Sequence, residues 1–594
     1  SDDEQYIISL EHQQIRIFQI DPSTEDINYL QTITTDVDTA TLKFDQAYLH
    51  EYTFAQAGDV MFICHQTFVP QLIVRTSLTT FQVESFEFAT RSDAKVIYQP
   101  YHKFQTSGMT LDPSGTSGSI SLTTSAAYWD IGELVTEDVA AGNFVTGNYY
   151  RIDTVGTTDF TLIGADSNTV GEIFVATGAG TGTGLADEMT QSKHIGTTVR
   201  YNKQEIEITH VRTNTVAVGT VQEELTITLV ENSFRTNNGS DKVEVLLVDH
   251  GLKVGDSVTF SLTQAVGSIN PTNLNGTRTV SAVIDNDQFE FTAGGVASES
   301  ELGGGTPRMT THAPITNWDE QSYSVLRGYP AAVTFHQSRL VLGGTLAQPD
   351  TIWFSKTNAF FNFDSGSAKD NESITLSANV GEIQQIRHLV SNRDLQVFSA
   401  SAEFYVPAFQ NQPLTPTNAQ IRRQTPFGSE FERPQVMDGA TVFVQKGGQI
   451  AREYIYSDAE AAYVANPISS LASHLIKTPI EMNTLYGALS RSENYVFVLN
   501  NDGTVAVFNS NRAEQRAGWV EFTTDGVFHS ITTVDDRVFA NVEFDLGDGT
   551  TKIILCEFNT AFNTDMAGIY AGTAGVFDVS GQFADGAVLQ VIDG

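Results

Sequence analysis

The glycine-rich run Gly178–Gly184, GAGTGTG, has the composition of a loop that could bind phosphate. Such a loop holds phosphate oxygens with backbone N–H groups when a strand precedes it, a helix follows it, and a Lys or a distal acid completes the site. Here the run is followed by LADEMTQS, which contains no Gly-Lys-Ser/Thr sequence. We therefore favour a flexible turn or a module boundary, and we assign no cofactor and no cofactor-binding residue.

Two pairs of aspartates have a spacing that could hold a cation. Asp285 and Asp287 lie in IDNDQF, and Asp545 and Asp548 lie in FDLGDGT. Carboxylate oxygens are preferred ligands of calcium, but neither segment contains a complete EF-hand loop or nonapeptide repeat. Short Asp/Asn/Gly runs between strands are common turns. The favoured interpretation is a turn in each case, and we assign no metal ligand.

The motifs of hydrolytic active sites are missing from the sequence. There is no GxSxG, no HExxH and no CxxC pair. Carboxylates are so frequent that their separation along the chain cannot nominate a glycosidase pair. The histidines that lie in strand-like or helix-like runs are isolated from such motifs: His336, His388, His474 and His529. We therefore predict that the chain is not an enzyme and assign no catalytic residue.

His336 and His388 occur at comparable places in strand-like runs, and arginines lie close to both in sequence. We expect these histidines to make structural hydrogen bonds. We expect the arginines to pair with acids such as Glu403, in an ionic network that braces neighbouring elements or subunits. A binding site is the alternative interpretation. The arginines are Arg339, Arg387 and Arg393.

Composition indicates a large globular chain without a disulfide framework. The 594 residues predict three or four domain-sized units, and 40% hydrophobic residues with 37 Phe exclude a disordered chain. No apolar run approaches the roughly 18 residues of a membrane span. Cys64 and Cys556 lie far apart in apolar runs, and we expect buried free thiols. Residue 1 is not Met, so we expect a segment to precede it.

The charge is strongly negative, with 33 Lys and Arg against 71 Asp and Glu and a net charge of −38. A protein that grips duplex DNA neutralises phosphates with a basic face, so this balance argues against tight DNA binding. Two interpretations stay open. The charge provides solubility, or it forms a surface along which nucleic acid passes without adhering, because like charges repel.

The elements that would position any of these residues are short strands. In Gly328–Pro407, apolar-alternating runs with the period of half-buried strands are separated by turn signals such as Gly343-Gly344 and Asn392–Asp394. Repeated four-strand units of this kind are typical of β-propeller blades. The runs are Ala332–Phe335, Arg339–Leu342, Thr351–Phe354, Leu395–Phe398 and Glu403–Val406.

We therefore predict an all-β chain with a β-propeller-like central domain that is interrupted by inserted small β modules. A Gly/Ser/Thr-rich stretch from residue 107 marks a boundary or a linker. Asn500–Thr504 predicts a hairpin with Gly at the turn, and Asn466–Lys477 predicts a helix with Pro at its first position. The predicted division is a first part of the core at 1–106, inserted Thr/Gly-rich modules at 107–325 (about 140–190 and 223–300), the remainder of the core at 326–562, and a C-terminal extension at 563–594.

Several ordered motifs resemble the tail nozzle, or tail tubular protein B, of short-tailed bacteriophages. They include GYPAAVTFHQSRLVLGGTLAQPDTIWFSKTNAFFNF, IRHLVSNRDLQVFSASAEFYV, PLTPTNAQIRRQTPFGS, RPQVMDGATVFVQKGGQIAREYIY and GWVEFTTDG. The resemblance covers about 1–106 and 320–562. The inserted pieces resemble small β modules scattered among phage structural proteins.

The resemblance implies a structural virion protein without an enzymatic step, located in the tail. Nozzles of this family form homohexameric rings that dock beneath the adaptor ring (tail tubular protein A), line the distal DNA channel, help to seat tail fibres and open for genome ejection. Double-stranded DNA would pass through the lumen without specific binding, and no membrane span is implied. The alternative is a host-receptor adhesin, or a glycan-binding and even glycan-cleaving tail protein, whose inserted modules bind the host surface.

Overall fold

The computed structural model describes residues 4–558, apart from positions 25, 39–40, 249, 367–368, 379–383, 409–411, 488–492, 513, 515 and 546–549. The fold is mostly β, with many antiparallel sheets, as the all-β prediction required. The chain divides into two compact units, which are considered separately. Unit 1 comprises residues 1–87 and 328–594, and unit 2 comprises residues 88–327. The expected extension at 563–594 lies outside the described residues.

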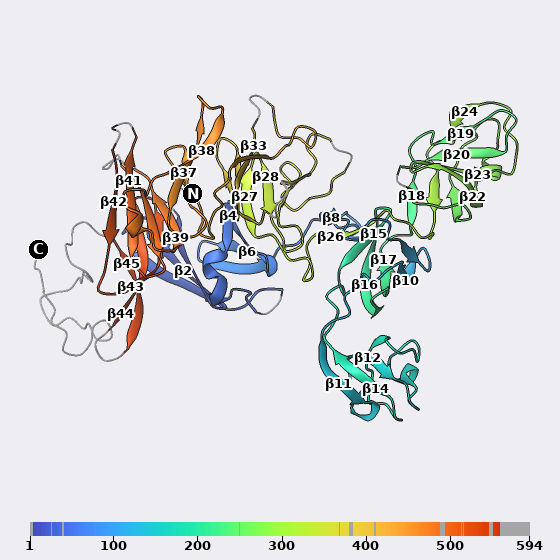
Figure 1. Ribbon diagram of the computed structural model, residues 1–594, viewed down its shortest axis with the longest axis horizontal. Coiled ribbons are helices and arrows are strands. Elements are labelled where there is room, and N and C mark those ends of the chain that lie inside the picture. Colours follow the sequence, from blue (N-terminus) through green and yellow to red (C-terminus); the bar gives the residue numbers. More distant parts are fainter. Residues whose placement is uncertain are drawn as a thin grey trace, which may run out of the picture. The chain divides into compact units, whose positions relative to one another are not determined.

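Unit 1 unites the N-terminal strands with strands from beyond residue 328, so that blue ribbons lie among yellow to red ones (Figure 1). Its described residues form seven antiparallel sheets of three or four strands that follow one another in the chain: β1–β3, β4–β7, β27–β30, β31–β34, β35–β38, β39–β42 and β43–β45. Within each sheet, every strand pairs with the next along the sequence, which is a meander. Each sheet is therefore built from strands that are consecutive in the sequence.

The strands of unit 1 are β1 (Gln5–Glu11), β2 (Gln14–Ile20), β3 (Ile27–Ile33), β4 (Thr53–Ala57), β5 (Val60–His65), β6 (Phe68–Ser77), β7 (Thr80–Ser85), β27 (Ala332–His336), β28 (Arg339–Gly343), β29 (Thr351–Phe354), β30 (Ile374–Ser377), β31 (Ile386–Ser391), β32 (Leu395–Ser399), β33 (Glu403–Val406), β34 (Arg422–Thr425), β35 (Gln435–Met437), β36 (Ala440–Val444), β37 (Ala451–Ser457), β38 (Ala462–Pro467), β39 (Pro479–Leu485), β40 (Asn494–Asn500), β41 (Val505–Asn511), β42 (Arg516–Phe522), β43 (Val527–Val534), β44 (Arg537–Asp545) and β45 (Thr551–Glu557). Two 3-10 turns, η1 (Gln46–Glu51) and η4 (Ser473–Leu475), accompany them.

Neighbouring sheets of unit 1 pack face to face through apolar clusters, and the succession closes on itself. Val341 and Val397 belong to the cluster between β27–β30 and β31–β34. Ile73 and Ile15 belong to the one between β4–β7 and β1–β3. Phe539 of β44 packs with Ile7 of β1, so the last sheet lies against the first. Each sheet thus has a neighbour on both faces.

This packing corrects one expectation. The runs Arg339–Leu342, Thr351–Phe354, Leu395–Phe398 and Glu403–Val406 do form strands, but all of their residues are buried. They are therefore not half-buried strands. A sheet that is covered on both faces hides the outward as well as the inward side chains of its central strands, so alternation in the sequence does not report exposure there.

Unit 2 contains three further antiparallel sheets. Their strand orders are β8-β26-β15-β16-β17-β10-β9, β11-β14-β12-β13 and β18-β25-β21-β22-β23-β20-β19-β24. The first and third share one apolar core that includes Trp129, Trp318 and Phe260, whereas the second has its own core around Phe144 and Phe174. The sheet of seven strands has strands from both ends of unit 2, which makes it the base that holds the unit together.

The elements of unit 2 are β8 (Tyr101–His102), β9 (Leu111–Pro113), β10 (Gly118–Thr124), β11 (Leu134–Ala140), η2 (Ala141–Asn143), β12 (Tyr149–Thr154), η3 (Phe160–Ile163), β13 (Ile173–Val175), β14 (Leu185–Met189), β15 (Thr198–Tyr201), β16 (Gln204–Thr213), β17 (Val216–Val221), β18 (Thr226–Thr228), β19 (Phe234–Thr236), β20 (Lys242–Leu246), β21 (Ser257–Ser261), α1 (Pro271–Leu274), β22 (Gly276–Asp285), β23 (Gln288–Thr292), β24 (Glu301–Gly303), β25 (Arg308–Thr310) and β26 (Trp318–Gln321).

Two local predictions were wrong. The Gly/Ser/Thr-rich stretch from residue 107 is not a linker, because it contains β9 and β10, whose Leu111, Ile120 and Leu122 are buried in the core of unit 2. The expected helix Asn466–Lys477 begins instead as the end of β38, where Asn466 pairs with Glu453, and continues into η4. Pairing with β37 gives the first residues of this segment cross-strand neighbours, which an isolated helix would lack.

The hairpin at Asn500–Thr504 is confirmed, since it joins β40 to β41. Gly503 has φ of +76°, and a Cβ there would lie 2.4 Å from Cγ1 of Val527 on β43. Only glycine satisfies both conditions without strain. Within the described residues, none of the helices is long and apolar enough to cross a membrane.

Candidate functional site

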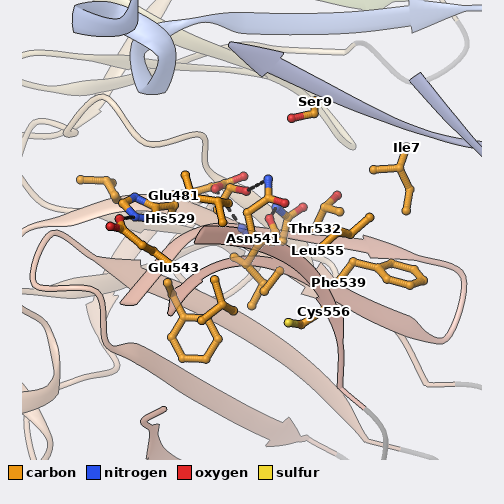
Figure 2. Close-up of a pocket in the computed structure, with 18 of the residues that line it drawn as sticks. Ile7, Ser9, Glu481, His529, Thr532, Phe539, Asn541, Glu543, Leu555 and Cys556 are labelled. Carbon is orange, nitrogen blue, oxygen red and sulfur yellow. Dashed lines mark hydrogen bonds and ion pairs between the residues drawn. The ribbon is translucent and has the colours of Figure 1, made fainter. Parts of the chain in front are cut away.

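A cavity of about 2130 Å3 lies inside unit 1. Its walls come from β1 and β2 on one side and from β43, β44 and β45 on the other, with β39, β35, β4 and η1 completing the lining. Figure 2 shows Ile7 and Ser9 facing the strands that carry Glu481, His529 and Asn541. The cavity thus lies where the last sheet meets the first.

Glu481 of β39 is the most perturbed acid in the wall. Its Oε2 accepts a hydrogen bond of 3.1 Å from the backbone N–H of Ile531 on β43. Asn483 Nδ2 donates to the carbonyl of the same Ile531 at 2.6 Å. The two side chains therefore bond to the backbone N–H and the backbone carbonyl of one residue in the next sheet. Burial raises the pKa of Glu481 to about 7, because the charged form loses hydration. At neutral pH this acid is protonated in a large fraction of molecules.

His529 and Glu543 form an ion pair in the same wall, with His529 Nε2 and Glu543 Oε2 2.6 Å apart. A hydrogen bond from Thr551, and then the one with His529, lower the pKa of Glu543. Across the cavity wall, burial and the nearby charge of His529 lower the pKa of His50. The charges of the site therefore compensate one another within the wall.

The remaining lining alternates small polar and apolar groups. Asn541 Nδ2 donates to Ser530 Oγ at 3.0 Å. Phe539 and Leu555 are apolar, and Cys556 is partly buried, with its thiol donating to the carbonyl of Ile554 at 3.7 Å. The groups that do bond in this wall bond mainly to other parts of the wall, which is the pattern of a structural site.

Other buried charged groups brace the sheets rather than face the cavity. Arg339 donates to the backbone carbonyls of Ser355, Glu372, Asp370 and Leu414 at 2.6–3.4 Å. In unit 2, Arg327 Nη2 lies 2.6 Å from Oε2 of the fully buried Glu320. Burial alone would raise the pKa of Glu320, but His194 and Arg327 hold it at about 2. Both arrangements fix the chain and offer no opening to a substrate.

The structure places the sequence candidates apart from one another. His336 Nδ1 bonds to Ser391 Oγ at 2.9 Å and His388 Nε2 to the carbonyl of Glu430 at 3.1 Å, in agreement with structural hydrogen bonding. Burial lowers the pKa of His388 to about 3, so it is neutral. Of the four histidines, His529 alone lines the cavity; His474 is exposed in η4.

Arg387 and Arg393 form ion pairs with acids other than the expected Glu403. Arg387 pairs with Glu430 at 3.0 Å and Arg393 with Asp458 at 3.9 Å. Glu403 instead accepts a short hydrogen bond from Thr425. Burial raises the pKa of Glu403 to about 7. The ionic bracing therefore exists, but Glu403 is not its acid.

The two candidate ligand sites resolve differently. Asp285 Oδ1 accepts a hydrogen bond of 2.8 Å from the backbone N–H of Asp287, inside the turn between β22 and β23. This contact agrees with the predicted turn. Asp548 lies outside the described residues, so the turn at Asp545 and Asp548 stays a prediction. The glycines from Gly178 to Gly184 lie between β13 and β14, and a strand rather than a helix follows them. Among the described residues, no group of three or more His, Cys, Asp or Glu side chains could hold a metal ion.

Sequence reasoning missed Glu481 and the buried Glu432. Each is a single acid in or beside a short strand, and nothing in PIEMNTL or FERPQVM distinguishes it from a surface acid. The signal is burial, which arises only when neighbouring sheets pack.

Comparisons with solved structures find only distant similarities. The chain is similar to the phage phi92 endosialidase, at 9% identity over 96% of this chain and 71% of that one, with a TM-score of 0.20. It is also similar to a proposed 6-phosphogluconolactonase from Bacteroides uniformis, at 10% identity over 60% and 95%, with a TM-score of 0.25. Both scores are too low to support a conclusion about fold or activity.

None of the curated proteins matches the sequence at a significant level. The family model of the bacteriophage nozzle protein, in contrast, matches residues 331–553, a range that includes strands of five consecutive sheets, from β27 to β45. The resemblance noted in the sequence is thereby confirmed over these residues, and over residues 1–106 it stays a prediction. Over these residues the chain is similar to the bacteriophage nozzle protein, a component of the virion tail.

Proposed function

We propose that the chain forms the distal nozzle ring of a short phage tail, lines the DNA channel and gates genome ejection. The observation that carries this proposal is the family match over residues 331–553. It is supported by the lack of a catalytic constellation in the cavity of unit 1 and by bracing, rather than reactive, roles of the buried charged residues.

We propose that the seven sheets of unit 1 are the blades of a β-propeller. Consecutive meanders of three or four strands, with each sheet covered on both faces, are the features of that architecture. Unit 2 would then be an insertion between β7 and β27, built of β modules on a sheet that uses both of its ends. A ring of packed sheets is well suited to bear mechanical force in a tail, because the force is distributed over all the interfaces between neighbouring sheets.

The proposed assembly is a homohexamer that docks to the adaptor ring and to tail fibres. Native mass spectrometry and electron microscopy of the purified chain, alone and with the adaptor, test this. A six-fold ring with an axial channel is expected. A persistent monomer in the presence of the adaptor would contradict the assembly, whatever the fold of the subunit.

The net charge of −38 supports a channel along which DNA slides without adhering. A basic wall would neutralise phosphates and hold the duplex, whereas an acidic one repels it. Retention of duplex DNA by the purified ring at low salt is the test, since low ionic strength exaggerates any attraction. No retention is expected, and tight binding would refute a sliding surface.

An adhesin is the second candidate, and the observation in its favour is that unit 2 has apolar cores of its own. Such a unit could bind a host receptor or glycan independently of the ring. Deletion of residues 88–327, with Glu87 joined to Gly328 by a short linker, separates the candidates. Loss of adsorption with ring assembly intact would favour the adhesin, and failed assembly would favour the nozzle.

A further inference from the structure

We call the interface between two neighbouring sheets of unit 1 a seam. The seven seams are not equivalent. Six of them join sheets that are consecutive in the chain, so the polypeptide itself links the two sides. The seventh, between β43–β45 and β1–β3, joins the last described sheet to the first. In the described residues, no sheet of unit 1 combines strands from both ends of the chain. Among the described residues, closure at this seam therefore depends on side-chain contacts.

Among the described residues, packing at the seventh seam is also sparser than at the seams on either side. Its cluster contains three buried apolar side chains among the described residues, namely Ile7, Ile20 and Phe539. The clusters at the seams on either side, between β1–β3 and β4–β7 and between β39–β42 and β43–β45, contain eleven each. Since stabilisation follows the apolar area removed from water, this seam is held more weakly than its neighbours.

The cavity of about 2130 Å3 lies at the same place and reduces the contact further. Ser9, Thr532 and Asn541 line it from the two sides (Figure 2). A polar cavity of this size can be filled by water, so much of the seam is already hydrated before it opens. Separation of its walls therefore exposes little additional apolar surface.

The comparison with the seam between β4–β7 and β27–β30 shows what is missing. There the connection runs through the whole of unit 2, so the tether is long. The backbone N–H of Tyr329 nevertheless donates to the carbonyl of Gln66 at 3.0 Å, and Thr53 Oγ1 donates to the carbonyl of Ala331 at 2.7 Å. Phe62 adds aromatic contacts with Phe335 and Phe361.

We propose that the ring of sheets in unit 1 has a built-in opening point, the seam between β1–β3 and β43–β45. The two sheets separate there as intact units while the other seams stay closed. Gln5 of β1, whose Nε2 donates to Asp535 Oδ2 after β43, acts as the latch across the seam. This inference concerns the single subunit and does not depend on the proposed role in the tail.

Thiol labelling of the full-length chain tests the proposal. In a Cys556→Ser background, Ile20→Cys places a thiol at a position that is 4% exposed in the seventh seam, and Ala402→Cys places one at a position that is 0% exposed between β27–β30 and β31–β34. The native Cys64, also 0% exposed, reports global unfolding inside each variant. Mass spectrometry of the labelled peptides separates the thiols.

We expect the Ile20→Cys thiol to be labelled at least about tenfold faster than Cys64 in the same molecule, with a shallow urea dependence, because opening of one seam exposes little surface. The Ala402→Cys thiol should follow Cys64. Labelling of the Ile20→Cys thiol at the rate and with the steep urea dependence of Cys64 would overturn the proposal, since only global unfolding would then expose the seam.

A second variant removes the concern that Ile20→Cys itself loosens the seam. Gln5→Ala, at a surface position, deletes the latch without touching the apolar cluster. It should speed labelling of the Ile20→Cys thiol by about threefold to tenfold, the effect of one lost hydrogen bond, and leave the Ala402→Cys thiol unchanged. An unchanged rate at Ile20→Cys would refute the latch and the opening point together.

Discussion

Glu432 carries a carboxyl group that is 4% exposed in the connection between β34 and β35. In the described part of the chain its Oε1 has no hydrogen-bond partner. Burial, and to a smaller extent the nearby charge of Glu430, raise the pKa of Glu432 to about 8, while Arg387 acts in the opposite sense. The folded chain therefore keeps this acid protonated at neutral pH, whereas the unfolded chain ionises it.

This difference makes the stability of unit 1 depend on pH with a definite sign. The folded state binds the proton more tightly, so the contribution of Glu432 is complete below the ordinary pKa of 4.5 and is lost as pH rises to about 8. Each pH unit between the two values corresponds to about 1.4 kcal/mol, so the whole loss is about 5 kcal/mol. Most of it has occurred by neutral pH.

Glu432→Gln is the perturbation that isolates the effect, because glutamine has the shape of the protonated acid and does not ionise. Urea unfolding of unit 1, followed by tryptophan fluorescence between about pH 5 and pH 9, measures the result. Near pH 5 the variant and the parent should agree to within about 1 kcal/mol. Near pH 9 the variant should be the more stable by several kcal/mol, up to about 5.

A matched control is Glu460→Gln, at an exposed position between β37 and β38. It should leave the slope of stability against pH unchanged. If Glu432→Gln shows the same slope as the parent chain, Glu432 is ionised in the folded state, and the reasoning from burial is refuted.

Three further outcomes follow from the packing of unit 1, each measured by urea unfolding. Arg339→Lys should lower the free energy of unfolding by about 2–5 kcal/mol, because a lysine cannot satisfy the four carbonyls that the guanidinium reaches; a neutral outcome would mean that water replaces it. Phe404→Ala should cost about 3–5 kcal/mol, since Phe404 is 1% exposed between two sheets, and a cost below about 1 kcal/mol would indicate a loose seam. Gly503→Ala should cost about 1–3 kcal/mol through its positive φ and its approach to Val527, whereas Gly518→Ala, with open space around its Cβ, should be close to neutral.

Local sequence determined the strands and most of their turns. The meander in Gly328–Pro407 was predictable because each strand pairs with its neighbour along the chain, so apolar runs and turn residues suffice to locate both. The hairpin at Asn500–Thr504 was predictable for the same reason, since its turn needs only a glycine that adopts a positive φ. The family followed from the order of motifs along residues 331–553.

Tertiary structure decided everything that depends on contact between sheets. A strand that is covered on both faces, such as β33, has a sequence like that of any other strand. The segment Asn466–Lys477 has a helix-like sequence, but its first residues form a strand that pairs with β37. The candidate site has the same origin. Glu481 and Glu432 acquire raised pKa values only because packing in the folded chain removes their hydration, and no spacing of residues along one chain encodes that.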